Sequence, residues 1–146
     1  MNVKAILEAK GTRVVTIRPD ASIAVAIHKL QLENIGALVV SQDGAHVRGL
    51  LTERDIVAGL AKHGAAVLDR RVEDLMIREV ATCGVEDSVR DVMATMTWRR
   101  TRHVPVIESD ALRGIVSIGD LVKARLEELE LETNVLRDRY FASRSP

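Results

Sequence analysis

One eleven-residue pattern occurs twice in this chain of 146 residues. Residues 47–57 read VRGLLTERDIV and residues 112–122 read LRGIVSIGDLV. With Thr52 aligned on Ser117, the match extends back over about fifty residues and needs one single-residue gap. A repeat of this length constrains the fold strongly, because both copies must form the same structural unit.

Each copy contains an amphipathic helix at the same place. Ser22 and Ser88 are residues of the type that begins helices. The apolar residues after each serine recur at spacings of three and four, which predicts helices over 23–34 and 89–99.

Two short strands follow each of these helices. β-Branched runs separated by turn-forming residues predict them at 37–41 and 47–51 in the first copy, and at 103–107 and 112–116 in the second. Thr52 and Ser117 then begin a further helix, with Asp55 and Asp120 in its first turn, where a carboxylate interacts favourably with the helix dipole. The repeated unit therefore reads β-α-β-β-α.

These elements predict an α/β (α+β) fold in which two units pack sheet to sheet as a pseudo-two-fold pair and form one core. We divide the chain into a first repeat with an N-terminal helix (1–65), a second repeat (66–127) and an amphipathic helical extension (128–146). Short helices at 3–7 and 72–76 lead into the two repeats.

Composition limits the classes of function. Lys plus Arg and Asp plus Glu are equal at 21 each, which argues against a domain-wide surface for nucleic acid or an anionic membrane. Cys83 is the single cysteine, so an intrachain disulfide and a CxxC metal site are excluded. Three of the four histidines, His28, His46 and His63, lack metal-ligand spacing. The polar N-terminus does not resemble a signal peptide, and we expect a reduced, cytoplasmic protein.

The repeats resemble a tandem pair of CBS (cystathionine-β-synthase) domains, a Bateman module. The motifs that carry the resemblance are PDAS (19–22) with VEDS (85–88), IGALVVSQDG with RHVPVIESD, and RGLLTERDIV with RGIVSIGDLV. The resemblance covers roughly residues 1–127. It implies a stand-alone regulatory ligand-binding module rather than an enzyme, often assembled as a homodimer and acting on an unknown partner protein. It also implies adenosine-containing ligands in two clefts between the repeats, and no catalytic cofactor.

The carboxylate that occurs in both repeats suits this ligand class chemically. One ionised carboxylate can accept hydrogen bonds from both hydroxyls of a ribose. By the resemblance, cleft one would use Ser117 and Asp120 with Val15, Ile35, Gly36 and Ala37. Cleft two would use Thr52 and Asp55 with Ala81, Thr101, Arg102 and His103. The alternative is that Asp55 and Asp120 are simply charges at helix starts.

Basic residues suggest where a phosphate would bind. WRRTRH (98–103) places Arg99, Arg100, Arg102 and His103 close together, and Arg54 lies inside the first T-x-x-D motif. Guanidinium groups suit phosphate, although Arg99 and Arg100 could equally be a solvated helix end. Because Gly36 matches Arg102 between the repeats, we expect unequal clefts, with phosphate held mainly by second-repeat residues. AMP or NAD(H) is therefore favoured over S-adenosylmethionine, and ADP and ATP stay possible.

Two other readings of the function stay open. The first is a CBS-fold interaction module without a physiological ligand, which the intact motif in both repeats argues against. The second is an enzyme subunit or DNA-binding regulator, which the charge balance and the lack of a catalytic constellation oppose. Among single residues, we expect Cys83 to be a small core residue. We expect Trp98 to pack in the core or at its rim, with the covering of an edge or of a dimer face as the alternative.

The last segment shows a different periodicity. Its heptad-spaced residues are Val122, Leu126, Leu129, Thr133, Leu136 and Tyr140. This seam is about two and a half heptads long, shorter than the three or four that identify a coiled coil. Two roles fit it equally: a helix that covers its own domain, or a helix that pairs with a second subunit.

Overall fold

The structure is a computed structural model that describes residues 1–144, so the last two residues of the expected extension (145–146) lie outside the described part. The elements in chain order are α1 (Val3–Lys10), β1 (Thr16–Ile17), α2 (Ile23–Glu33), β2 (Ala37–Val40), β3 (Gly49–Thr52), α3 (Glu53–His63), a 3-10 helix (Gly64–Asp69), α4 (Val72–Leu75), β4 (Cys83–Gly84), α5 (Val89–Arg99), β5 (His103–Glu108), β6 (Ala111–Ser117) and α6 (Ile118–Ala142). Both β-α-β-β-α units are present, as the repeat predicted.

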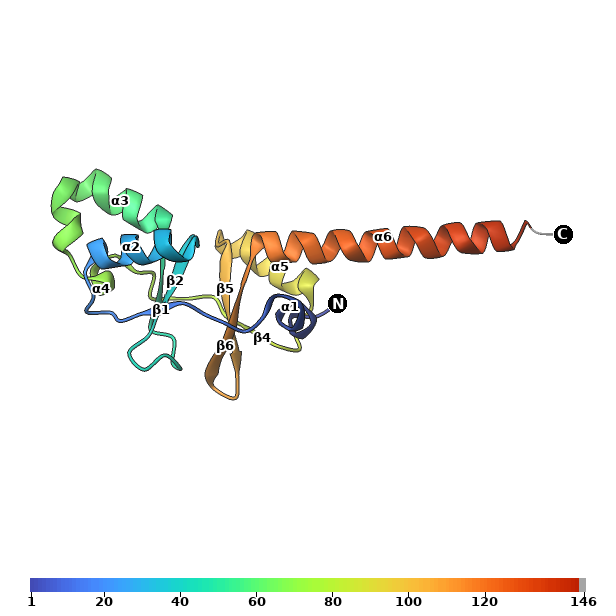
Figure 1. Cartoon of the computed structure of the whole chain (residues 1–146), viewed down its shortest axis with the longest axis horizontal. Coiled ribbons are helices and arrows are strands. Elements are labelled where there is room, and N and C mark those ends of the chain that lie inside the picture. The colour runs from blue at the N-terminus through green and yellow to red at the C-terminus, as the bar shows by residue number, and fades with distance from the viewer. Residues whose placement is uncertain (145–146) are drawn as a thin grey trace.

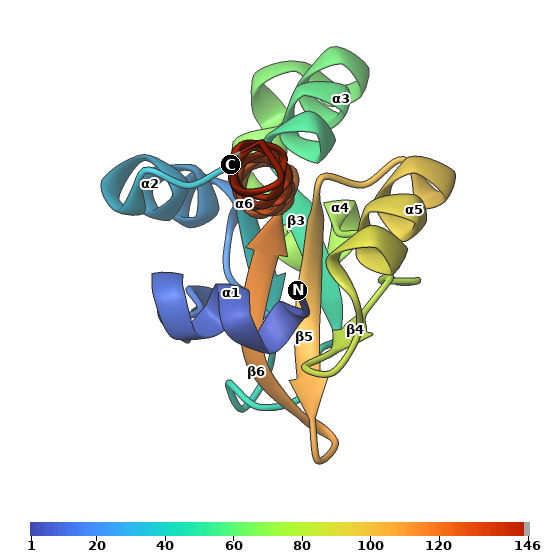
Figure 2. The ribbon, with the colours of Figure 1, turned by 90° about the vertical axis from the view of Figure 1, so that its right-hand side faces the viewer.

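Each repeat forms its own three-stranded sheet, and the two sheets have the same topology (Figure 1). β1 pairs in parallel with β2, which pairs antiparallel with β3. β4, β5 and β6 repeat this arrangement. In the middle of the molecule the sheets stand face to face, with helices on their outer sides (Figures 1 and 2).

The expected helix starts are confirmed by hydrogen bonds. The hydroxyls of Ser22 and Ser88 accept from the amides of Val25 and Asp91 at 3.2 and 3.0 Å. α2 and α5 then end at equivalent left-handed residues, Asn34 and Arg100. The two helices are therefore bounded alike at both ends.

The short helices α1 and α4 pack across the repeat boundary. α1 precedes the first repeat but lies on the second sheet, where the amides of Val3 and Lys4 donate to carbonyls of residues 87 and 85 at 2.9 Å. α4 follows the first repeat and contributes Val72 to the first repeat's core. Each short helix therefore leads into one repeat in the sequence but packs on the core of the other repeat.

The glycine of each Arg-Gly motif makes room for one of these segments. A Cβ on Gly114 would lie 2.7 Å from a methyl group of Leu7 in α1. A Cβ on Gly49 would lie 2.5 Å from the sulfur of Met76 and 2.9 Å from the Ile77 carbonyl. Both glycines therefore allow a close approach that a side chain would block.

The hydrophobic interior has three clusters rather than the single core expected. Two lie between a sheet and its helices, one in each repeat, and they are built from Val, Leu, Ile, Ala and Met. The third lies between the sheets and is small, with Ala37, Val39 and Leu50 buried in it. Cys83 is buried as expected. The expectation for Trp98 is wrong: it is 86% exposed near the end of α5 and so is not packed in the core or at its rim.

α6 leaves the body of the molecule (Figure 1). Leu121 and Ala124 anchor its first turns in the second repeat's core. Beyond Glu128 every described residue of the helix is exposed, so the seam does not cover the chain's own domain. In the described residues, no helix has the length and apolar character needed to cross a membrane.

Candidate functional site

Two equivalent strand-to-helix corners form the centre of the site. The Thr52 hydroxyl accepts from the Asp55 amide at 3.3 Å, while Oδ2 of Asp55 accepts from the Thr52 amide at 2.8 Å. Ser117 and Asp120 repeat this capping box at 3.2 and 2.8 Å. Among the described residues, Oδ1 of neither aspartate has a hydrogen-bond partner. Each corner thus fixes a carboxylate in place and leaves one oxygen available.

Cleft two opens between α3 of the first repeat and the start of β5 in the second. It has a volume of about 640 Å³. Its lining includes the expected residues Thr52, Arg54, Asp55, Thr101, Arg102 and His103, and it also includes Gly36. Ala81, which was expected there, does not line it.

Cleft one lies on the other side of the same junction and is smaller, about 400 Å³. It is lined by the expected residues Val15, Ile35, Gly36, Ala37 and Ser117. Asp120, which was expected in this cleft, does not line it, but its Oδ2 accepts from Nζ of Lys10, which does, at 2.7 Å. Gly36 and His103 line both clefts, so the two clefts share one wall.

The cations of the two clefts differ in their partners. In cleft one, Lys10 pairs with Asp120, and Arg13 pairs with Glu33 at 2.9 Å. In cleft two, the described structure gives the guanidinium groups of Arg54, Arg100 and Arg102 no hydrogen bond or ion pair. Cleft two therefore offers unpaired positive charge, as a phosphate would require.

Two ionisable groups near the shared wall have shifted pKa values. Partial burial raises the pKa of Asp120, but the hydrogen bonds from Lys10 and Ser117 outweigh it, and the net shift is downward. Desolvation lowers the pKa of His103, and Lys10 and Arg102 lower it further, against the opposing charges of Glu53 and Asp120. At neutral pH Asp120 is therefore ionised, and the His103 ring is neutral and can both donate and accept a hydrogen bond.

Sequence reasoning missed Lys10 and Arg13. Both lie between the first helix and the first strand or at the end of that helix, and neither belongs to a repeated motif. They reach cleft one because α1 packs on the second sheet, where Nζ of Lys10 also donates to the Ile115 carbonyl at 3.0 Å. A basic residue at the end of the first helix was the only sequence signal for this role.

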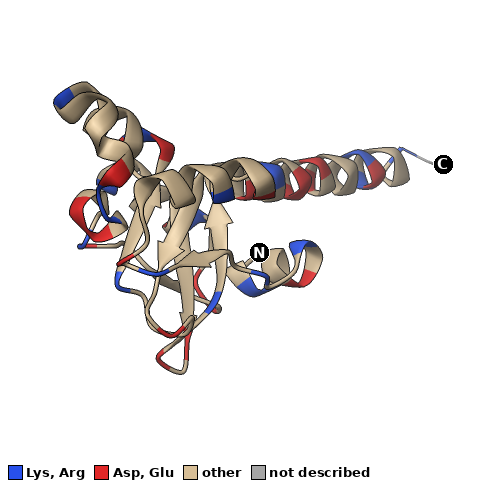
Figure 3. Cartoon of the chain, turned by 60° about the vertical axis from the view of Figure 1, so that its left-hand side comes forward, with Lys and Arg blue, Asp and Glu red and all other residues tan. Residues whose placement is uncertain are grey.

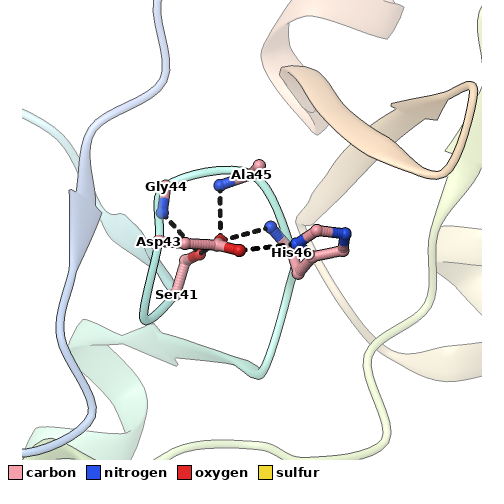
Figure 4. Close-up of polar contacts among 5 residues, drawn as sticks. All are labelled: Ser41, Asp43, Gly44, Ala45 and His46. Atoms are coloured by element: carbon pink, nitrogen blue, oxygen red, sulfur yellow. Dashed lines mark hydrogen bonds and ion pairs between the residues drawn. The ribbon is translucent and has the colours of Figure 1, made fainter.

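A separate polar cluster lies in the loop between β2 and β3 (Figure 4). Oδ1 of Asp43 accepts from the amides of Ala45 and His46 at 2.8 and 2.9 Å, and Oδ2 lies 2.6 Å from Nδ1 of His46. This cluster orders the loop and lines neither cleft. Within residues 1–144 no group of three or more His, Cys, Asp or Glu side chains is arranged to hold a metal ion.

Comparison with known proteins gives consistent relatives. The CBS domain family model matches residues 4–62 and again 72–127. The mitochondrial CBS domain-containing protein CBSX3 of Arabidopsis thaliana is 35% identical, over 75% of this chain and 55% of that relative. The crystal structure of the CBS-domain containing protein ATU1752 from Agrobacterium tumefaciens is 46% identical, with a TM-score of 0.83 over 86% of this chain and 99% of that chain.

A further similar structure contains bound adenosyl compounds. The CBS domain pair of protein MJ0100, in complex with 5′-methylthioadenosine and S-adenosyl-L-methionine, has a TM-score of 0.76 and 26% identity over 85% of this chain and 98% of that chain. The repeated unit, its two sheets and the family match agree with one another. The chain belongs to the CBS domain family and carries two tandem CBS domains.

Proposed function

We propose that this protein is a non-catalytic sensor of adenosine-containing small molecules, which bind in clefts one and two. The supporting observation is the pair of equivalent corners, each of which fixes a carboxylate and leaves one of its oxygens available: Asp55 lines cleft two, and Asp120 pairs with Lys10, which lines cleft one. A ribose supplies two adjacent hydroxyls to such a carboxylate, and the apolar lining of cleft one suits a purine ring. The structure of MJ0100 with two adenosyl compounds supports the same ligand class.

Phosphate-bearing ligands are the better fit to cleft two. Arg54, Arg100 and Arg102 exceed the two carboxylates of the lining, Glu53 and Asp55, by one charge. AMP or NAD(H) is therefore our first choice, ahead of ADP, ATP and S-adenosylmethionine. In this proposal the occupied protein, as a homodimer, signals to a partner protein.

Calorimetric titration of the full chain tests this function. The panel is AMP, NAD, NADH, ADP, ATP, S-adenosylmethionine and 5′-methylthioadenosine. Asp55→Asn and Asp120→Asn keep the side-chain shape but remove the charge in one cleft each. We expect AMP affinity to fall about ten-fold or more in Asp55→Asn, because a charged acceptor is lost from the ribose.

The matched control is Asp91→Asn, a first-turn carboxylate of α5 that lines neither cleft. It should bind as the wild type does. If the folded, ligand-free protein binds no member of the panel, the proposal is wrong and the interaction-module reading takes its place.

A further inference from the structure

The outer half of α6 has an apolar seam with nothing covering it. From Leu129 to the end of the helix every described residue is exposed, and Leu136 is 66% exposed. A projecting helical segment of this kind gains little from tertiary packing, and isolated helices of similar length are marginal in water. The seam is therefore the surface through which α6 would be stabilised.

We propose that the seam packs against the same helix of a second copy of this chain, in parallel and in register. The spacing of four and three residues from Val122 to Tyr140 places one apolar stripe along the helix. A stripe that faces its own copy across a two-fold axis is complementary to itself. The anchors Leu121 and Ala124 lie to the side of this stripe, so pairing leaves them in place.

The charges beside the seam favour the parallel arrangement (Figure 3). One flank carries Lys123, Glu130 and Arg137, and the other carries Arg125, Glu132 and Arg139. In a parallel pair each residue of the second flank faces the residue of the first flank five positions later in the other copy. Arg125 then faces Glu130, and Glu132 faces Arg137, each twice by symmetry. Arg139 has no such partner within α6, which ends at Ala142. Arg125 also bonds Glu128 within its own helix at 2.9 Å, and in the pair it is shared between the two carboxylates.

An antiparallel pair brings like charges together. When the whole seam overlaps, each flank faces itself, so Lys123 meets Arg137, Glu130 meets its own copy, and Glu132 meets its own copy. Sliding the helices by one heptad relieves this repulsion. The slide leaves either Leu136 and Tyr140 or Val122 and Leu126 of each chain without a partner. Only the parallel pair therefore combines the full seam with attractive flanks.

The mass of the full chain in sedimentation equilibrium tests the surface. We expect the ligand-free wild type to have twice the 16.1 kDa mass of one chain. Leu129→Asp puts a charge in the seam and should give the single-chain mass. Leu131→Asp makes the same change at another exposed leucine, outside the seam, and should leave the dimer intact. A monomeric wild type, or a Leu129→Asp variant that stays dimeric, would overturn the proposal.

Cysteine cross-linking tests the orientation. Ser143 lies seven residues beyond Leu136 and continues the seam. In a parallel dimer, Ser143→Cys should cross-link to its own copy upon oxidation. In the fully overlapped antiparallel dimer the two positions are roughly 35 Å apart, too far for a disulfide. Wild type is the control, since Cys83 is buried. A dimer that does not cross-link would refute the parallel arrangement.

Charge reversal gives an independent check on the flanks. Glu132→Arg should weaken the dimer because it turns both Glu132–Arg137 contacts into repulsions. Adding Arg137→Glu should restore the affinity, because the pair is then reversed and attractive again. This readout uses no ligand, so its outcome is separate from that of the sensor proposal. Equal dimer affinity in the single and double variants would contradict the facing charges.

Discussion

At the scale of single residues, the two repeats differ in how the aspartates of their capping boxes are engaged. Asp55 is held only by Thr52, whereas Asp120 is held by Ser117 and by Lys10 at 2.7 Å. A ribose that binds Asp120 through both oxygens must therefore displace Lys10. Lys10 would then be free to contact a phosphate, if the ligand has one.

Replacing Lys10 should separate these two effects. In Lys10→Met on an Asp55→Asn background, we expect adenosine to bind cleft one about 2–5-fold more tightly, because a partly exposed ion pair worth up to about 1 kcal/mol no longer competes. AMP should gain less, since it loses a cation. Calorimetric titration measures both, with Lys4→Met on exposed α1 surface as the control. Unchanged adenosine affinity would count against competition by Lys10.

The glycines of the repeated motif make a second prediction at this scale. Gly49→Ala should lower the free energy of unfolding by about 1–3 kcal/mol, because the new methyl group overlaps Met76 and the Ile77 carbonyl. Gly119→Ala, in the first turn of α6, meets only the Ser117 hydroxyl at 3.6 Å. It should be neutral or stabilising by up to about 1 kcal/mol. Urea unfolding compares the two, and equal losses would argue against the close approach.

At the scale of elements, hydrogen bonds fix the boundaries that the sequence suggested. The capping serines begin α2 and α5 where expected, and α2 ends one residue before the expected boundary. These starts are predictable because a cap is local: the hydroxyl bonds an amide three residues later. The left-handed residue that ends α5, Arg100, was harder to predict than these starts, because arginine has no preference for that conformation.

The loop between β2 and β3 gives a pH prediction at the element scale. The hydrogen bond and charge of Asp43 raise the pKa of His46, while bonds from the His46 amide and ring hold the pKa of Asp43 well below its usual range. The contribution of His46 to the free energy of unfolding is complete below its pKa in the unfolded chain, near 6.5, and is lost as pH rises through its raised pKa in the folded protein. The contribution of Asp43 to the free energy of unfolding is present above about pH 4 and is lost as pH falls through its lowered pKa in the folded protein.

Proton NMR titration measures this coupling directly. We expect His46 to titrate above pH 6.5 and His103 to titrate below it. Asp43→Asn keeps an oxygen for the loop amides but removes the charge, so the pKa of His46 should fall while His103 stays unchanged. A His46 titration that is the same in both proteins would show that Asp43 does not set it.

At the scale of the whole molecule, the crossed packing of α1 and α4 ties the two repeats together. Leu7 precedes the first repeat but is buried in the second repeat's core, whereas Met76 packs on the first. The same crossing carries Lys10 to cleft one. The clefts are therefore products of both repeats and of the helix that precedes them.

Truncating Leu7 tests the crossing. Leu7→Ala should lower the free energy of unfolding by about 2–5 kcal/mol. Amide hydrogen exchange should rise first in the second repeat, around β5 and β6. Met76→Ala is the matched variant and should raise exchange first around β2 and β3. If Leu7→Ala instead affected the first repeat most, the assignment of α1 to the second core would be wrong.

The sequence by itself determined the repeated unit, the order of its strands and helices, and the corners that hold Asp55 and Asp120. These features depend on local periodicity and on bonds between residues three apart. Most of the site residues that the family resemblance implied also line one of the two clefts. Whether those residues bind a ligand remains a prediction.

The tertiary structure decided what depends on distant parts of the chain. It put Lys10 and Arg13 in cleft one, left Ala81 outside cleft two and exposed Trp98 on α5. It also excluded one of the two roles expected of the last helix, that of covering its own domain, because α6 leaves the second repeat in a direction that carries its seam away from the chain's own surface. Local patterns cannot encode such placements, since each depends on how two separately formed sheets pack against each other.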